Sequence, residues 1–380
     1  MALKSSNKVS GSRIDFLTSE DQHQPVLVVV FLRGGADGLT LAPPHGDDAY
    51  HRARPTLAVP ESGLHDLNGY IGLNKSMSSL MPLWEEGLLA LHHGVGSNDV
   101  TRSHFAAQDL MEHGGQIAGG WLARFLRHHS CAQGPLSSVA IGTTMPESLR
   151  GAPGGAVVQS IDEFKIGTND RGAIDRLRRL YEATPGPLGE AGKGTLDAIS
   201  RLHSLRSGPE PEAPETYPDS RLGRGLREIA KLIKAQVGLV ASTIDAVGGG
   251  LGWDTHFVQS TAIDELMKDL ADSIRAFVAD LDSYAARTKI VVMTEFGRRV
   301  SENSSFGTDH GSGSLMLTIG QDLPGGAGVF SHFDDLSSSH LLGPGDVPVG
   351  SDYRHVLSDL LGTIDANCDM ERVFPDLNGA

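Results

Sequence analysis

The hydrophobic positions of the chain form continuous runs at several places. The clearest run, at residues 26–32, is apolar at every position rather than at alternate positions, which is typical of a strand covered on both faces. Similar runs predict strands at residues 88–92, 289–294 and 314–319. Most of these runs lead into polar or glycine-rich loops, which fits strands of a parallel sheet.

Apolar residues spaced three and four positions apart predict helices between these strands. One repeat occupies residues 260–287 and another occupies residues 221–237, and each gives an amphipathic helix one apolar face. Strands that alternate with helices indicate an α/β fold. We therefore expect a three-layer sandwich with a mostly parallel central sheet.

The domain organisation follows from breaks in these patterns. Residues 1–24 are polar and charged and form an N-terminal extension, and residues 25–380 form a single α/β domain. Around residues 171–219 we expect an insertion of charged helical pieces that ends in a proline-rich stretch. Proline at this density excludes a helix interior or a central strand, so the stretch is a surface loop.

Charge and composition exclude several classes of function. The 380 residues include 47 acidic and 32 basic ones, which gives a net charge of -15. Nucleic acids and anionic membranes bind clustered Lys and Arg, so neither is an expected partner. Two cysteines are too few for a disulfide framework or a zinc finger. The N-terminus lacks the apolar core of a secretory signal, so we expect a cytoplasmic protein.

Five short segments hold most of the candidate functional side chains. Because ligands bind at the carboxyl ends of the strands in an open parallel sheet, loops far apart in the sequence can converge there. Each segment follows a predicted strand or lies in a polar or glycine-rich turn. The segments are RGGADG (33–38), TRSHF (101–105), GWDTH (252–256), TEFGR (294–298) and GTDHG (307–311).

Carboxylate and imidazole groups in three of these segments predict a metal site. The candidate ligands are Asp254, His256, Glu295, Asp309 and His310. Carboxylate oxygen and imidazole nitrogen are ligands for zinc, manganese and similar divalent ions. The alternative is that each aspartate caps a turn and each histidine satisfies a backbone carbonyl. We expect one or two bound divalent ions, and zinc and manganese are the metals that this ligand set favours most.

The TRSHF segment offers a nucleophile. Ser103 lies between Arg102 and His104, and its hydroxyl could attack phosphorus or sulfur when a metal or a base activates it. Alternatively, Ser103 is the N-cap of a helix that begins beside it. Arg102 and Arg298 could hold a phosphate or sulfate group through paired hydrogen bonds, although each alone is more often a surface residue. These four are the candidate catalytic residues.

The RGGADG segment follows the first strand as a phosphate-binding loop would. It has neither the P-loop pattern nor the dinucleotide fingerprint, so mononucleotide and NAD binding have little support. Glycine lets the backbone turn tightly and approach a ligand closely. The candidate substrate-binding residues here are Arg33, Gly34, Gly35 and Asp37.

Taken together and in this order, the segments resemble those of the bacterial family called domain of unknown function 1501, a branch of the alkaline phosphatase and sulfatase superfamily. The resemblance covers about residues 26–361. It implies a largely parallel sheet with helices on both faces and a metal site at its carboxyl edge. It also implies that Asp254 and His256 are one pair of ligands, that Asp309 and His310 are another, and that Ser103 stands where a nucleophile is expected.

The chain departs from the superfamily pattern at two places. An aspartate directly after the first strand is replaced by Arg33-Gly34, and an Asp-His pair after a later strand reads Glu295-Phe296. These replacements remove ligands that a complete two-metal site would need.

These observations lead to two hypotheses about function. The first is a metal-dependent enzyme that hydrolyses, transfers or eliminates a phosphate or sulfate ester of a small metabolite. The second is a degenerate, non-catalytic member that serves as a binding or scaffold subunit of another enzyme. A protein partner and a homo-oligomer both stay open.

Overall fold

The computed structural model describes residues 24–377 except residues 100, 130–131, 133, 162–170, 207–214 and 249–251. The N-terminal extension up to residue 23 and most of the proline-rich stretch therefore lie outside the described residues. The main sheet has nine strands, in the order β12-β4-β11-β8-β1-β7-β5-β6 with β13 paired to β4. The strands are β1 (Val26–Leu32), β4 (Leu89–Gly96), β5 (Ser138–Ile141), β6 (Gly155–Val158), β7 (Ala241–Ala246), β8 (Thr288–Met293), β11 (Ser314–Ile319), β12 (Gly328–Ser331) and β13 (Ser351–Asp352).

The described sheet is parallel at every pairing except the two that involve β11. Two small antiparallel sheets accompany it, β2 (Leu64–Asp66) with β3 (Gly72–Asn74) and β9 (Arg298–Glu302) with β10 (Thr308–His310). The helices are α1 (Gly38–Leu41), α2 (Asp48–Ala53), α3 (Met81–Glu85), α4 (His104–His113), α5 (Trp121–His128), α6 (Arg171–Glu182), α7 (Pro187–Arg206), α8 (Arg221–Lys234), α9 (Gln259–Leu281), α10 (Tyr353–Ile364) and α11 (Met370–Val373).

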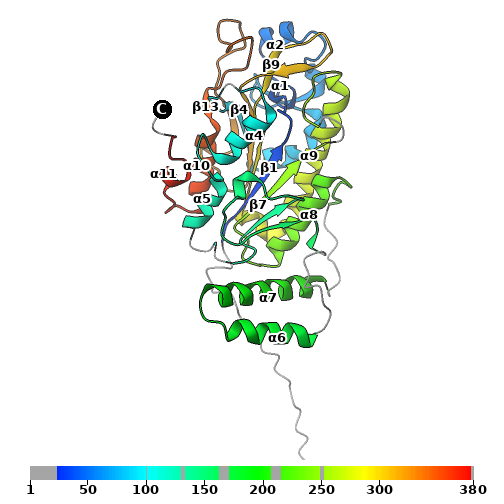
Figure 1. Ribbon diagram of the computed structural model, residues 1–380. Helices are drawn as coiled ribbons and strands as arrows, with labels where there is room; N and C mark the ends of the chain where they lie inside the picture. The colour runs from blue at the N-terminus through cyan, green and yellow to red at the C-terminus, as the bar shows by residue number, and fades with distance from the viewer. Residues whose placement is uncertain are drawn as a thin grey trace, which may run out of the picture.

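Strand β1 lies near the centre of the sheet, and its side chains enter two different cores. Alternate residues, such as Val28 and Val30, pack in one hydrophobic cluster with α8 and α9. The residues between them, such as Val29, pack in a second cluster with α5 and α10. Figure 1 shows these helix pairs on opposite faces of the sheet. The predicted three-layer α/β sandwich with a mostly parallel sheet is thus confirmed.

The predicted elements correspond to β1, β4, β8, β11, α8 and α9, with errors at their ends. The helix predicted over residues 221–237 ends at Lys234, because the backbone takes positive φ at Gln236 and Gly238. The helix predicted over residues 260–287 ends at Leu281, since Asp282 has φ 49° and a 3₁₀ helix follows. Strand β7 was not predicted, because its serine, threonine and aspartate interrupt any apolar run.

The insertion around residues 171–219 contains α6 and α7. In Figure 1 these two helices lie at one end of the molecule, while α1, α4 and β9 lie toward the other end. These two helices therefore lie far from the carboxyl edge of the sheet. Among the described residues, no helix is both long enough and apolar enough to cross a membrane.

A buried ion pair fastens the loop after β1 to the small sheet. Arg54 and Asp37 are both buried and are joined by two hydrogen bonds, of 2.5 and 3.0 Å. Arg54 also donates to the carbonyl of Val300 in β9, and Asp37 accepts from Thr40 and Gln259. This carboxylate is occupied on both oxygens by the protein itself, so the structure gives Asp37 a structural role in place of the substrate contact expected from the sequence.

Replacement of Asp37 by Asn is expected to lower the free energy of unfolding by about 3 kcal/mol at pH 7, because Arg54 keeps a buried charge without its partner. Burial alone would raise the pKa of Asp37, but Arg54 outweighs burial and holds the pKa below its ordinary value. The stabilisation is therefore present above the unfolded pKa of about 3.9 and is lost as the pH falls through the folded pKa. Urea denaturation should show that the difference in the free energy of unfolding between wild type and variant is smaller at pH 3 than at pH 7.

The matched control is Asp359→Asn, which changes an exposed aspartate on α10. It should leave the free energy of unfolding nearly unchanged at pH 7. The role of the ion pair would be contradicted if Asp37→Asn changed the free energy of unfolding as little as the control variant does. A loss of stability that grows at acid pH would contradict it as well.

Candidate functional site

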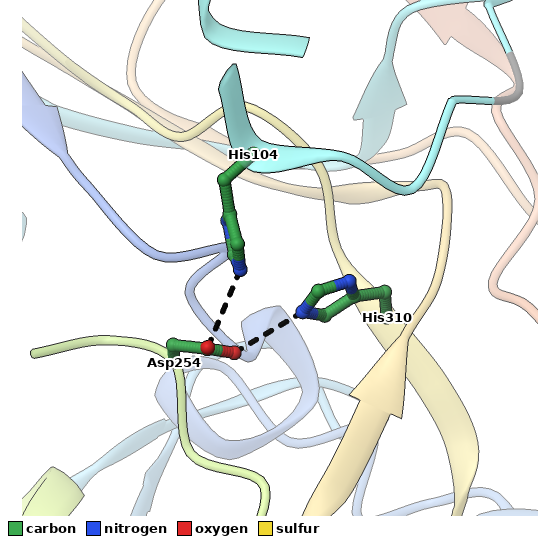
Figure 2. A group of neighbouring side chains, drawn as sticks. All are labelled: His104, Asp254 and His310. Atoms are coloured by element: carbon green, nitrogen blue, oxygen red, sulfur yellow. Dashed lines mark hydrogen bonds and ion pairs between the residues drawn. The ribbon is translucent and has the colours of Figure 1, made fainter. Parts of the chain in front are cut away.

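Two histidines and an aspartate meet at the carboxyl edge of the sheet, each from a different segment. His104 is the first residue of α4, Asp254 lies in the loop between β7 and α9, and His310 ends β10. One ligand atom from each lies within 4.8 Å of the other two. Figure 2 shows both imidazole rings directed at the Asp254 carboxylate.

A third histidine joins this group. His256 Nε2 lies 3.1 Å from Asp254 Oδ1 and 2.9 Å from His310 Nε2. His310 Nε2 is also 3.1 Å from Asp254 Oδ1, and His104 Nε2 is 3.4 Å from Asp254 Oδ2. Three imidazole nitrogens therefore surround one carboxylate, and we call these four residues the His-Asp cluster.

The opposite nitrogen of each ring faces an oxygen that fixes its orientation. His104 Nδ1 lies 2.8 Å from Glu295 Oε1, and His310 Nδ1 lies 2.9 Å from the carbonyl oxygen of Arg102. His256 Nδ1 faces Asp309 Oδ1 at 3.6 Å. Carboxylate and carbonyl oxygens only accept, so with a cation between the rings these contacts would hold the hydrogen of each neutral ring on Nδ1 and leave Nε2 to bind the cation. Without a cation, Nε2 of His310 lies within hydrogen-bond distance of Asp254 Oδ1 and of His256 Nε2, so at least one of these nitrogens carries a shared hydrogen.

The two inner histidines differ in their electrostatics. The hydrogen bond to Glu295 raises the pKa of His104, so a metal ion would have to displace a proton there. Burial lowers the pKa of His310, which favours its neutral, metal-binding form. Burial would raise the pKa of Asp254, but hydrogen bonds from Arg298 and His310 outweigh it and keep the pKa below its ordinary value. His104 Nε2 is buried and makes no hydrogen bond. A cation that displaced its hydrogen would satisfy this unpartnered nitrogen, so the residues present fit a metal ion.

Glu295, a predicted ligand, supports the cluster rather than facing into it. Its side chain is fully buried and one oxygen accepts from three donors, the Gly34 backbone N–H, His104 Nδ1 and Gln108 Nε2, at 2.8 to 2.9 Å. Burial would raise the pKa of Glu295, but the hydrogen bonds from His104 and Gln108 hold it below its ordinary value. An ionised Glu295 orients His104, as carboxylates commonly orient metal-bound histidines.

Asp309 has a similar position behind His256. Its carboxylate accepts from Asn303 at 3.1 Å and lies 3.4 Å from Arg299. The Asn303 hydrogen bond keeps the pKa of Asp309 below its ordinary value. Of the five predicted metal ligands, the structure thus brings Asp254, His256 and His310 into the cluster and places Glu295 and Asp309 next to it.

Arg298 is buried beneath Asp254 and is fully engaged with the protein. It donates to Asp254 Oδ1 at 2.7 Å, and its side chain is completely buried. It also donates to the carbonyls of Gly34, Gly35, Trp253 and Thr308. Because the guanidinium is buried and already hydrogen-bonded to these groups, it is not accessible to a substrate. These contacts suit Arg298 to positioning Asp254 and the loop after β1.

Arg102 and Ser103 lie where the chain enters α4. The Arg102 carbonyl accepts from the His310 ring, and its guanidinium donates to the His310 carbonyl and to Asp346. Ser103 precedes α4 in the N-cap position, but its side chain makes no cap hydrogen bond and the residue is exposed. Ser103 therefore occupies the predicted N-cap position, but its hydroxyl does not make the capping hydrogen bond.

The loop after β1 contacts the cluster through its backbone. A Cβ at Gly34 would lie 2.6 Å from the Asp254 nitrogen, and one at Gly35 would lie 2.5 Å from the Phe296 ring. Only glycine permits this close approach. The Arg33 side chain pairs with Glu112 and Asp245, at 2.5 and 3.0 Å, so these carboxylates already neutralise its charge.

His104 is the member of the cluster that sequence reasoning did not assign to the metal. It was grouped with Ser103 as a candidate catalytic residue instead. Its spacing from Gln108 was the available signal, because residues four apart share one helix face. Both side chains use that face to bind Glu295.

Comparison with known families places the chain. Residues 95–364, well over half of the sequence, match the family described as Protein of unknown function (DUF1501). The chain belongs to this family. The match begins at the end of β4 and includes every member of the His-Asp cluster, so the family region contains the whole cluster. No curated protein matches the sequence.

Solved structures to which the chain is similar include a phosphatase, a sulfatase and a phosphonate hydrolase. The alkaline phosphatase from the Antarctic bacterium TAB5 is 9% identical, with 81% of this chain and 95% of that chain covered at a TM-score of 0.35. The 2-O GAG sulfatase BT1596 is 13% identical, with 89% and 71% covered at 0.31. The phosphonate monoester hydrolase of Agrobacterium radiobacter is 10% identical, with 78% and 68% covered at 0.30.

Replacement of Arg298 by Lys is expected to lower the free energy of unfolding by about 3 kcal/mol or more. An ammonium group cannot reach the separate carbonyls that the guanidinium holds, and buried carbonyls without donors are costly. Urea denaturation measures the loss. Arg299→Lys is the control, because the Arg299 side chain is one-third exposed and should change stability by less than about 1 kcal/mol. Equal effects of both substitutions would contradict the positioning role of Arg298.

Proposed function

We propose that this protein is a metal-dependent enzyme that acts on a phosphate or sulfate ester, with the His-Asp cluster holding the metal ion. The observation that carries the proposal is the convergence of three Nε2 atoms on Asp254 while protein oxygens hydrogen-bond Nδ1 of His104 and His310. The buried Nε2 of His104 has no hydrogen-bond partner, and a cation would bind it together with the other two Nε2 atoms.

The donor set favours zinc. Imidazole nitrogen suits zinc better than magnesium or calcium, and one carboxylate completes a common zinc ligand set. His256 is the outermost member, with 36% of its side chain exposed and the longest contact to an anchoring oxygen. We assign His104, Asp254 and His310 as the principal ligands and His256 as the ligand on the open side.

The surroundings support one ion rather than two. The Phe296 ring packs against the rings of His104 and His310, with centroids 4.9 and 4.7 Å away, and blocks that side of the cluster with apolar atoms. Arg298 contributes a fixed positive charge 2.7 Å from Asp254 on another side. In this proposal, Arg298 takes the electrostatic place that a second cation would have.

The entry to α4 is suited to an anionic ester group. The positive end of a helix favours phosphate and sulfate, and His104 is the first residue of this ten-residue helix. A bound divalent cation supplies Lewis acidity, which stabilises the charge that develops on the ester oxygens. We assign Ser103 as the attacking hydroxyl, because it is adjacent to His104 and exposed, and its side chain does not cap the helix.

Metal analysis by inductively coupled plasma mass spectrometry tests the cluster. After loading with zinc and gel filtration, the wild type should retain about one equivalent. The variants His104→Ala, Asp254→Ala and His310→Ala should each lose it, while His256→Ala should retain part of it. Glu295→Gln and Asp309→Asn should weaken zinc binding by about 10-fold to 100-fold, because they orient ligands without supplying them.

The control for metal binding is His340→Ala. His340 is an exposed histidine hydrogen-bonded to Asp335, which reproduces a His-carboxylate pair outside the cluster. It should retain zinc as the wild type does. Circular dichroism verifies that each variant is folded. Full zinc retention by a folded Asp254→Ala variant would contradict the proposed site.

Turnover of phosphate and sulfate esters tests the activity. Ser103→Ala should retain zinc but lower kcat by about 100-fold or more, since it removes the attacking group and none of the ligands. Asp109→Ala, an exposed change on the same helix, should leave kcat unchanged. A wild type that binds no metal and turns over no ester would favour the scaffold hypothesis, in which the cluster serves only the fold.

A further inference from the structure

Large exposed apolar side chains lie in the same chain segments as members of the His-Asp cluster. Phe105 follows His104 and is 84% exposed, and Phe257 and Val258 follow His256 and are 57% and 53% exposed. Phe306 lies three positions before Asp309 and is 58% exposed. An isolated exposed apolar residue is ordinary, but a group of them around one site marks a binding surface. We call these four residues the apolar rim.

Backbone hydrogen bonds hold two parts of this rim side by side. The Val258 nitrogen donates to the Ser305 carbonyl at 3.0 Å, and the Gln259 nitrogen donates to the Phe306 carbonyl at 2.9 Å. The same two segments supply His256 and His310 to the cluster. Phe257, Val258 and Phe306 are therefore fixed on the backbone that positions two of the metal ligands, and Phe105 is fixed on the helix that positions a third.

The backbone is strained at two of the four rim positions. Val258 has φ 46° and ψ 45°, and Phe306 has φ 58°. Left-handed backbone is unfavourable for bulky residues and most unfavourable for β-branched ones, whereas glycine adopts it without penalty. The fold itself would be better served by glycine at both positions. Strain of this kind persists where a side chain is needed for binding or catalysis.

We propose that the apolar rim binds the organic group of the ester, so that the preferred substrates carry an aryl or branched alkyl group rather than a sugar or another polar group. This inference rests on the proposed function, because it places the phosphate or sulfate at the metal ion and the organic group on the rim. The apolar side chains exclude water from one side of the ester and contribute affinity in proportion to the apolar area that they cover.

The position of the rim argues against permanent burial by another macromolecule. Hydrogen bonds join the two rim segments to each other and to the His256 carbonyl, so a protein bound over the rim would lie beside the metal site and hinder the entry of substrate. The net charge of -15 disfavours adsorption to an anionic membrane. A small apolar group that enters together with its ester is the occupant that leaves the site usable.

Calorimetric titration of the zinc-loaded protein with non-hydrolysable anions tests the inference. One pair of probes is methylphosphonate and phenylphosphonate, and a second pair is methanesulfonate and benzenesulfonate. The phenyl probe of the favoured pair should bind about tenfold more tightly than its methyl partner. The pair that binds also shows whether the site takes phosphate-like or sulfate-like anions.

Three rim variants and one distant variant make the test specific. Phe257→Ser, Phe306→Ser and Val258→Gly should each weaken the phenyl probe several-fold and leave the methyl probe unchanged. Val258→Gly should also raise the melting temperature, because it relieves the strained backbone. Leu188→Ser on α7, at a residue that is 68% exposed, should change neither affinity.

The outcomes separate this inference from the proposed function. If methyl and phenyl probes bind the zinc-loaded wild type equally well, or if the rim variants weaken both probes alike, the rim does not select the organic group and the inference is overturned while the anion site stands. If neither probe of either pair binds, the proposed function is overturned and the inference falls with it.

Discussion

A carboxylate buried at the end of a strand has to be fully hydrogen-bonded, and Glu295 meets this requirement by joining three parts of the chain. It follows β8 and accepts from the loop after β1 and from two side chains of α4. The loop, the helix and the strand are thereby fixed relative to one another. The position of His104, and with it the geometry of the His-Asp cluster, depends on this one group.

The second organising charge is the buried guanidinium of Arg298. It donates hydrogen bonds to backbone carbonyls of the loop after β1 and to the Asp254 carboxylate, and so links that loop to the cluster. Two ionised carboxylates and one buried cation in so small a volume would be costly without full pairing. The site is therefore held by charges that are already satisfied within the protein, and in the cluster His104 Nε2 is the described buried nitrogen without a hydrogen-bond partner.

The fold could be predicted from the sequence where periodicity is strong, and the site only in part. Continuous apolar runs identified β1 and β8, since both faces of these strands are covered. Short strands such as β5 and β6 carry too few residues for any period to emerge. In the site, residue type led to Asp254, His256 and His310, which the structure brings together, but residue type does not distinguish a ligand from the group that orients a ligand. In the proposed site Glu295 and His104 exchange roles for that reason, because only the three-dimensional arrangement shows which polar atom faces inward.

The members of the cluster are dispersed along the chain, from the start of α4 to the end of β10, with four strands of the main sheet between them. A zinc finger gathers its ligands from a few neighbouring residues and can use the metal to drive folding. Here the cluster can form only after long-range strand pairing has brought distant segments together, so folding comes first and metal binding second. The cluster is thus a late product of the folding pathway, and under the proposed function retention of a metal ion would report that the chain has reached its native topology.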